Sequence, residues 1–179
     1  AAILTITSFA SYVMGLFRDR IFAQTFGAGE ELDAYNASFV IPDLLLNIFV
    51  AGALSAAFIP VFSGLLAKEK REEAGELASS VLNSALFLMA GFGVVVFIFA
   101  PFVTPVIAPG FSEENKIRLV QLLRIMVLSP VIFAVSNTLG GMLVGFRRFL
   151  SYGLSPVFYN LGIIGGALFL APSFGIYGV

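Results

Sequence analysis

Long apolar stretches separated by short polar connectors constrain the fold of this 179-residue chain more than any other feature. A membrane-spanning helix needs about 20 mainly apolar residues. Five segments meet this length, at about residues 1–26, 32–66, 77–107, 117–146 and 152–171. None alternates polar and apolar residues with a period of two, as strands of a membrane barrel do. The sequence therefore predicts an all-α, polytopic transmembrane bundle of about five helices.

The composition excludes several other classes of protein. Hydrophobic residues make up 59% and charged residues 12% of the chain, whereas soluble domains carry roughly 25% charged residues. The formal net charge of −1 offers no basic surface for nucleic acid. The chain contains no Cys and no His, so it lacks thiol nucleophiles, imidazole bases and the usual zinc ligands. We expect a membrane protein that is no enzyme and has no metal or cofactor.

The beginning and end of the sequence suggest an excerpt. The chain starts without an initiator methionine and stops at Gly178-Val179. We therefore expect it to be part of a longer polypeptide.

The positions of Lys and Arg in the connectors predict an orientation, because these residues stay on the cytoplasmic side. The connectors after the second and fourth segments carry five of them: Lys68, Lys70, Arg71, Arg147 and Arg148. The alternate connectors carry two, Lys116 and Arg118. The side with five basic residues is predicted to be cytoplasmic, which also places the N-terminus there.

Arg18 is the most conspicuous polar residue within an apolar segment. It lies nine residues before Gly27, or about 13 Å along a helix axis and thus near the bilayer midplane. A charge there costs roughly 2.5–3.5 kcal/mol and marks a functional site by default. We expect Arg18 to face protein or a water-filled cavity, with Asp19 as a second candidate. The alternative is local neutralisation by Asp19, although adjacent helical residues point about 100° apart.

Four polar residues of the second segment fall within an arc of about 80° on a helix: Asp33, Asn36, Asp43 and Asn47. The first segment has its own small or polar stripe, formed by Ser11, Gly15 and Arg18. We expect both stripes to line one hydrophilic cavity. The alternative is that these stripes only pack between helices.

Further features fit a bent bundle. Six prolines lie inside or at the ends of the apolar segments: Pro42, Pro60, Pro101, Pro105, Pro130 and Pro156. Such prolines kink membrane helices where neighbours satisfy the released carbonyl groups, which suits a transporter that alternates between two shapes.

Arg124 lies deep in the fourth segment, so it needs a partner or water and is a further cavity candidate.

Several motifs occur together in an order typical of one family. They are Gly15-Leu16-Phe17-Arg18-Asp19, Phe26-Gly27-Ala28-Gly29 with Asp33-Ala34-Tyr35, Ile41-Pro42-Asp43-Leu44-Leu45, residues 52–60, Ala108-Pro109-Gly110-Phe111, and the stretch from Arg148-Phe149 through Pro156 to Asn160. Through them the chain resembles the MurJ (MviN) family of lipid II flippases, in the multidrug/oligosaccharidyl-lipid/polysaccharide (MOP) exporter superfamily. The resemblance covers essentially the whole chain.

The resemblance implies a MATE-like protein of two lobes around a cationic cavity, with this chain forming about five helices of the N-terminal lobe. Such proteins carry lipid II, the undecaprenyl-pyrophosphate-linked peptidoglycan precursor, from the inner to the outer leaflet of the bacterial plasma membrane by alternating access. Its implied partners are lipid II, membrane lipids and the missing C-terminal lobe. Arg18, Asp19 and Asp33 match charged positions that the family uses in or beside the cavity, and an arginine can hold pyrophosphate oxygens bidentately.

The chain also departs from the family pattern. Tyr12 stands where the family commonly has an arginine, Leu46 and Asn47 stand where it has basic residues, and Ala51 replaces an acidic residue. The cavity thus loses cationic side chains, which leaves a flippase for another polyprenyl-linked glycan as an alternative. Two other readings stay open. A cation-coupled multidrug exporter would use Asp33 and Asp43 as cation sites, and a membrane scaffold would recruit cell-wall enzymes without transport. Coupling to an ion or to the membrane potential is compatible with the flippase readings.

Overall fold

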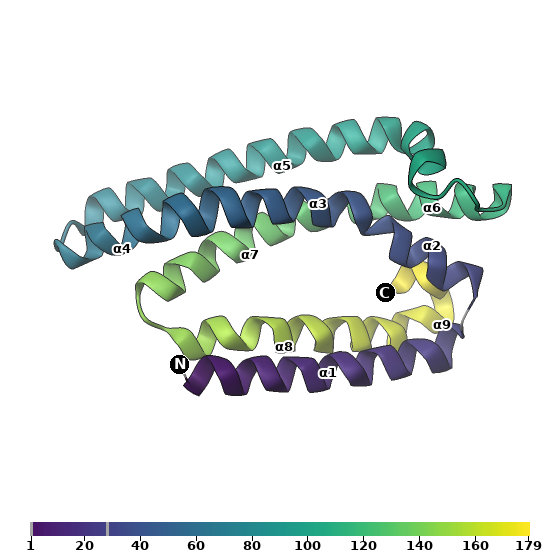
Figure 1. Cartoon of the computed structure of the whole chain (residues 1–179), viewed down its shortest axis with the longest axis horizontal. Coiled ribbons are helices and arrows are strands. Elements are labelled where there is room, and N and C mark those ends of the chain that lie inside the picture. Colours follow the sequence, from purple (N-terminus) through teal and green to yellow (C-terminus); the bar gives the residue numbers. More distant parts are fainter. Residues whose placement is uncertain (1, 28) are drawn as a thin grey trace. The chain divides into compact units, whose positions relative to one another are not determined.

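The structure is a computed structural model that describes residues 2–27 and 29–179, without the side chains of residues 2, 50, 51, 53 and 55. The predicted start of the first segment at Ala1 and the departure at Ala51 therefore lie outside the described residues or side chains. All regular structure in the described residues is helical, which confirms the predicted all-α class (Figure 1). The helices form two compact units, one comprising the residues up to Tyr35 and from Arg148 to Val179, the other Asn36 to Arg147.

The first unit contains α1, the start of α2, and the C-terminal helices. Their bounds are α1 Ala2–Phe26, α2 Glu30–Ser38, α8 Phe149–Gly165, π-helix η2 Gly166–Leu170, α9 Ala171–Phe174 and 3-10 helix η3 Gly175–Gly178. α1 ends because Gly27 takes a left-handed conformation with φ of +68°. α2 then begins with Glu30, Glu31 and Asp33, whose carboxylates favour the positive end of the helix dipole.

α8 lies along α1 in the same direction, as Figure 1 shows. Gly153 in α8 makes this close approach possible. A Cβ atom at this position would meet the side chain of Thr7 in α1, at its hydroxyl oxygen and its Cβ. Thr7 is buried and donates its hydroxyl hydrogen to the carbonyl of Ile3 at 3.0 Å, so its polar group is satisfied within α1.

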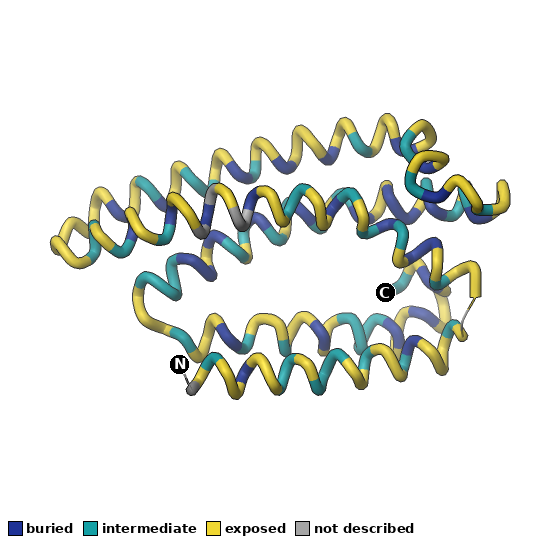
Figure 2. The backbone as a smooth tube through the Cα atoms, viewed as in Figure 1, coloured by how far each residue is buried: buried dark blue, intermediate teal, exposed yellow. Residues whose placement is uncertain are grey.

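The second unit packs three long helical segments. Their bounds are α3 Val40–Ile48, π-helix η1 Phe49–Phe58, α4 Ile59–Ala67, α5 Arg71–Ile107, α6 Glu113–Met126 and α7 Leu128–Gly145. Large side chains of η1 and α4, including Phe58 and Phe62, fill a core against the alanines and Met89 of α5. Gly141 and Gly145 on α7 admit these two phenylalanine rings, because a Cβ at either position would crowd them. Figure 2 shows the resulting pattern of buried and exposed positions.

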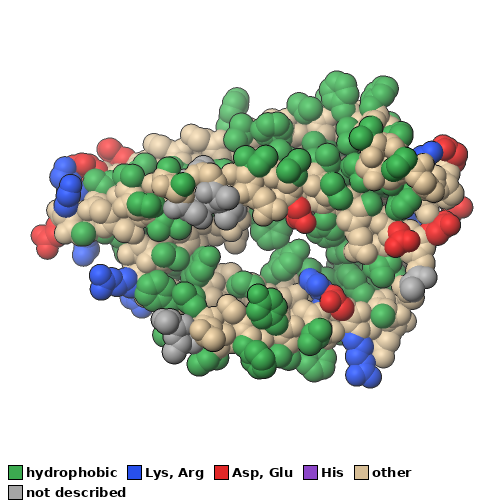
Figure 3. Space-filling model, in the orientation of Figure 1, with side chains coloured by type: hydrophobic (Ala, Val, Ile, Leu, Met, Phe, Trp, Pro, Cys, Tyr) green, Lys and Arg blue, Asp and Glu red, His purple; other side chains and the backbone are tan. Residues whose placement is uncertain are grey.

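Three described helical segments are long and apolar enough to cross a membrane: Arg71–Ile107, Glu113–Gly145 and Phe149–Gly178. α5 exposes a large apolar surface from its middle to its C-terminal end, including Phe87, Phe102 and Val106, and Figure 3 shows charged side chains near its two ends. Exposed apolar surface of this extent suits contact with lipid. The first predicted segment is interrupted by charges at 18–20, and the second is divided among α2, α3, η1 and α4. That all five segments span the bilayer, and that the N-terminus is cytoplasmic, stay predictions.

Two helices begin earlier than the apolar segments suggested. α5 starts at Arg71 rather than near residue 77, and α6 starts at Glu113 rather than near residue 117. Both first turns carry two glutamates, and the Ser112 hydroxyl accepts a hydrogen bond from the backbone N–H of Asn115 at 3.4 Å. Acidic residues and a serine cap stabilise helix N-termini, so the polar connectors extend the helices beyond their apolar parts.

The prolines are accommodated in different ways. Pro42 and Pro130 fall in the first turns of α3 and α7, where no helical N–H is needed. Pro101, Pro105 and Pro156 lie inside helices. Pro60 follows the π-helical stretch η1 by two residues, just as Pro172 follows η2. The Ile59 N–H donates to the Leu54 carbonyl, five residues back. A proline ring clashes with the carbonyl four residues earlier, and the wider π turn relieves this clash.

Candidate functional site

Arg18 is held at two places on its guanidinium group. Its Nε and Nη2 atoms donate to one carboxylate oxygen of Asp19 at 3.0 and 2.8 Å. Its Nη1 donates to the side-chain oxygen of Asn160 in α8 at 3.2 Å. The Arg18 side chain is 31% exposed and that of Asp19 is 63% exposed. Local pairing with Asp19, the alternative raised by the sequence, is therefore present, and Asn160 adds a partner from another helix.

Both polar atoms of the Asn160 side chain, Oδ1 and Nδ2, form hydrogen bonds with α1, so this residue connects α8 to α1. Besides accepting from Arg18, its Nδ2 donates to the Ser11 carbonyl at 3.4 Å, the Ser11 hydroxyl at 3.3 Å and the Pro156 carbonyl at 3.0 Å. Asn160 is only 6% exposed. We call Ser11, Arg18, Asp19 and Asn160 the Arg18 cluster. The two polar residues of the predicted stripe, Ser11 and Arg18, thus both contact α8 through Asn160.

Asn160 lies in one of the family motifs of the sequence but was not among the predicted site residues. A buried amide within an apolar segment was an available signal, because polar groups in a bilayer need partners. Its specific partners, 142 and 149 positions away in the chain, depend on how α1 and α8 pack.

The start of α2 belongs to the same unit. Tyr35 is buried and packs edge-on against Phe22 of α1, with ring centres 5.5 Å apart. The Tyr35 phenol lies within electrostatic range of Arg18 in α1 and of Tyr159 in α8. Asp33, two residues before Tyr35, is exposed. α1, α2 and α8 therefore all place polar groups near Arg18, and Tyr35 and Tyr159 are two further residues that belong to the quoted motifs but were not predicted as site residues.

The remaining members of the second predicted stripe lie in the second unit. Asn36, Asp43 and Asn47 are all exposed, together with Val40 on the same face, while Pro42 and Phe49 are buried. Phe39 joins α2 to α3, because its backbone has right-handed helical angles and its N–H donates to the Asn36 carbonyl at 3.3 Å. The three residues therefore share one exposed face, as their spacing predicts. That this face contacts water, and shares a cavity with Arg18, stays a prediction.

Arg124, the last candidate, has a partner in the structure. It is exposed on α6, and its Nε donates to the Phe97 carbonyl of α5 at 3.3 Å. Its guanidinium carbon also lies 5.1 Å from the centre of the Phe97 ring, a cation–π contact. The expected need for a partner is met by α5. A role in the cavity stays a prediction.

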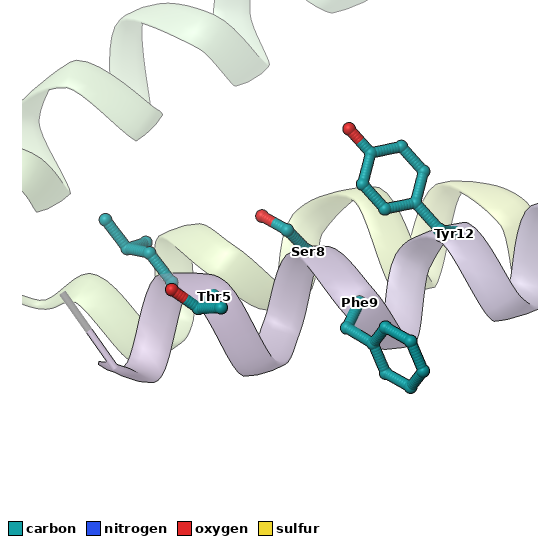
Figure 4. Close-up of a pocket in the computed structure, with 5 residues that line it drawn as sticks. Thr5, Ser8, Phe9 and Tyr12 are labelled. Carbon is teal, nitrogen blue, oxygen red and sulfur yellow. The ribbon is translucent and has the colours of Figure 1, made fainter.

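Tyr12, one of the departures from the family pattern that the sequence resembles, is 76% exposed. It lines an open hollow of about 470 Å³ on α1 with Leu4, Thr5, Ser8 and Phe9. Figure 4 shows Ser8 and Tyr12 extending to the same side of α1, with Phe9 on the other. Two hydroxyl groups on this face provide polar contacts without positive charge.

No group of three or more acidic residues, histidines or cysteines that could hold a metal occurs in the described part of the chain. The helical structure of the described residues, their three long apolar helices and the Arg18 cluster around the buried Asn160 define part of an α-helical, multi-pass membrane protein. The sequence model described as lipid II flippase MurJ matches residues 22–179. The chain therefore belongs to the MurJ lipid II flippase family, as its motifs predicted.

Curated relatives agree with this assignment. The chain is 32% identical to the lipid II flippase MurJ of Thermosipho africanus, over 97% of this chain and 36% of the relative. It is 33% identical to the probable lipid II flippase MurJ of Thermotoga maritima, over 90% and 34%. The lipid II flippase MurJ of Burkholderia cenocepacia is 29% identical, over 96% and 34%. The chain spans about a third of the length of these relatives.

Proposed function

We propose that the full-length protein containing this chain translocates lipid II from the inner to the outer leaflet of the bacterial plasma membrane by alternating access. Family membership supports the lipid-linked cargo. The single observation that supports a role for this chain is the environment of the Arg18 side chain. It is partly exposed, fixed by Asp19 and Asn160, and located in a helix that is otherwise mainly apolar.

Arg18 has the chemistry to bind the pyrophosphate of such a cargo. A guanidinium group has five N–H hydrogens, and its described contacts use one on each of its three nitrogens. Nη1 and Nη2 therefore each keep one hydrogen that no described residue takes. Two donors on neighbouring nitrogens suit two phosphate oxygens. In this proposal Asp33 and Asp19 orient or gate the headgroup, and Asn36, Asp43, Asn47 and Arg124 contribute to a hydrated cavity.

Transport would require no covalent chemistry. The lobe that contains this chain would alternate between two arrangements relative to the rest of the polypeptide. Preferential binding of cargo or of an ion to one arrangement, or the membrane potential, would shift their populations. The N-terminus would lie in the cytoplasm, with the basic connectors around Lys70 and Arg148 on the same side.

A complementation experiment tests the function. Full-length protein would be produced in bacteria depleted of their own flippase, with growth and outer-leaflet lipid II as readouts. The parent should restore both, whereas Arg18→Ala and Asp33→Ala at matched expression should not. Failure of a well-expressed parent would contradict lipid II as cargo.

A second candidate is a flippase for another polyprenyl-linked glycan. It is favoured by the neutral residues Tyr12, Leu46 and Asn47 at positions where the family has basic ones. Under this alternative, the parent would fail to expose lipid II, while Arg18 would still be needed for binding a polyprenyl pyrophosphate. Lipid II exposure in the complementation experiment separates the two candidates, whereas binding of undecaprenyl pyrophosphate, which carries neither sugar nor peptide, tests the Arg18 role that both share.

A further inference from the structure

The orientation of the Asn160 amide is determined by its surroundings. Its oxygen faces a donor, Nη1 of Arg18, and its nitrogen faces two carbonyl oxygens, those of Ser11 and Pro156. Rotating the amide by half a turn would place its NH₂ group against the guanidinium donors and its oxygen against the carbonyls. Because Asn160 is buried, water would not compensate for those mismatches. The amide therefore presents a fixed acceptor to Arg18.

This acceptor completes the restraint of the guanidinium plane. Asp19 holds the edge formed by Nε and Nη2, and Asn160 holds Nη1. A long arginine side chain otherwise loses rotamer freedom when it binds a ligand. Fixing it beforehand removes part of that cost, which is the benefit of preorganisation.

The neutral charge of the amide matters as much as its geometry. Asp19 already supplies one negative charge to the single positive charge of Arg18. A second carboxylate in place of Asn160 would hold Nη1 equally well but give the cluster a net negative charge, which would repel an anion. An amide positions the guanidinium without adding a second negative charge.

We propose that Asn160 is the positioning residue of the cargo site: it orients Arg18 so that the remaining Nη1 and Nη2 hydrogens meet the pyrophosphate of a polyprenyl-linked cargo. This inference rests on the proposed function of Arg18. It gives α8 a direct part in recognition, although the group that contacts the cargo lies on α1.

Binding measurements on the purified full-length protein in nanodiscs test this role, with undecaprenyl pyrophosphate as the probe. The variants are Arg18→Ala, Asn160→Leu, the double variant, and Asn83→Leu, which changes an exposed asparagine of α5. We expect Asn160→Leu to bind roughly tenfold more weakly, as for a lost hydrogen bond to a charged group. Asn83→Leu should bind like the parent.

The double variant separates positioning from packing. If Asn160 acts through Arg18, adding Asn160→Leu to Arg18→Ala should cause less than about a twofold further loss, because coupled residues are not additive. A full additional tenfold loss, or an unchanged affinity of Asn160→Leu, would overturn the proposal. Undiminished binding by Arg18→Ala would instead overturn the proposed function of the site.

Asn160→Asp provides a variant of the same size if Asn160→Leu does not fold. It keeps the acceptor oxygen for Arg18 but adds a charge. We expect it to bind the pyrophosphate probe at least tenfold more weakly, with the deficit growing as salt is lowered, since screening then decreases. Parent-like affinity at low salt would contradict the requirement for a neutral amide.

Discussion

Arg124 in α6 donates its Nε hydrogen to the carbonyl oxygen of Phe97 in α5, at 3.3 Å. In a regular helix this carbonyl would accept from the backbone N–H four residues later, but that residue is Pro101, which has none. The arginine therefore supplies the donor that the proline removes. The basic residue selected from the sequence as a cavity candidate thus has a structural partner on a neighbouring helix.

Removing this donor should weaken the packing of α6 on α5. We expect Arg124→Leu to lower the stability of the full-length protein by about 1–2 kcal/mol, from the lost hydrogen bond and cation–π contact. Thermal unfolding in detergent measures the effect. In a Pro101→Ala background, position 101 regains its N–H, so the same substitution should cost less than half as much. Equal losses in both backgrounds would show that the Phe97 carbonyl is not the relevant partner.

The contact between Gly153 and Thr7 gives a prediction for the first unit. Gly153→Ala would place a methyl group against the Thr7 side chain, and overpacking of this kind typically costs about 1–3 kcal/mol. Gly162→Ala in the same helix is the matched control, because its Cβ would meet no atom within 4 Å. We expect a lower melting temperature for the first variant only. Thr7→Ala should recover part of the loss, and its failure to do so would locate the strain elsewhere.

Water access distinguishes a cavity from packing at the exposed face of α3. The described chain has no cysteine, so single cysteines can be introduced into a cysteine-free full-length protein. We expect Asp43→Cys and Asn47→Cys to react with a membrane-impermeant thiol reagent. Phe87→Cys, at an 85% exposed position on the apolar surface of α5, should be protected by lipid. Protection of all three positions would favour the packing alternative.

The predicted orientation can be tested at two helix connectors. Glu69 lies between α4 and α5, and Gly110 lies between α5 and α6. Because α5 is long and apolar enough to span the bilayer, cysteines at these positions should be labelled from opposite sides. We expect Gly110→Cys to react in intact cells and Glu69→Cys only after permeabilisation. The reverse pattern would invert the assigned topology.

The sequence predicted those features that depend on residues close to one another along the chain. Apolar length located the helical segments, and the spacing of Asn36, Asp43 and Asn47 indicated one helix face, on which all three are exposed. The cost of a charge in lipid singled out Arg18. By contrast, the roles of Asn160 and Phe97 depend on helix packing, because each meets its arginine across 142 or 27 positions of chain. The prolines indicated departures from regular helix, but not that Pro60 would be preceded by a π-helical stretch.

The π geometry of Phe49–Phe58 also affects how the two ends of this segment are related. A π turn contains more residues than an α turn, so the chain advances less along its axis for each residue. Conversion of this stretch to α geometry would lengthen the segment and rotate α4 about its axis relative to α3, with no helix unfolding. The polar face of α3 and the core-packing face of α4 are thus joined by a stretch whose length and twist both depend on its hydrogen-bond pattern.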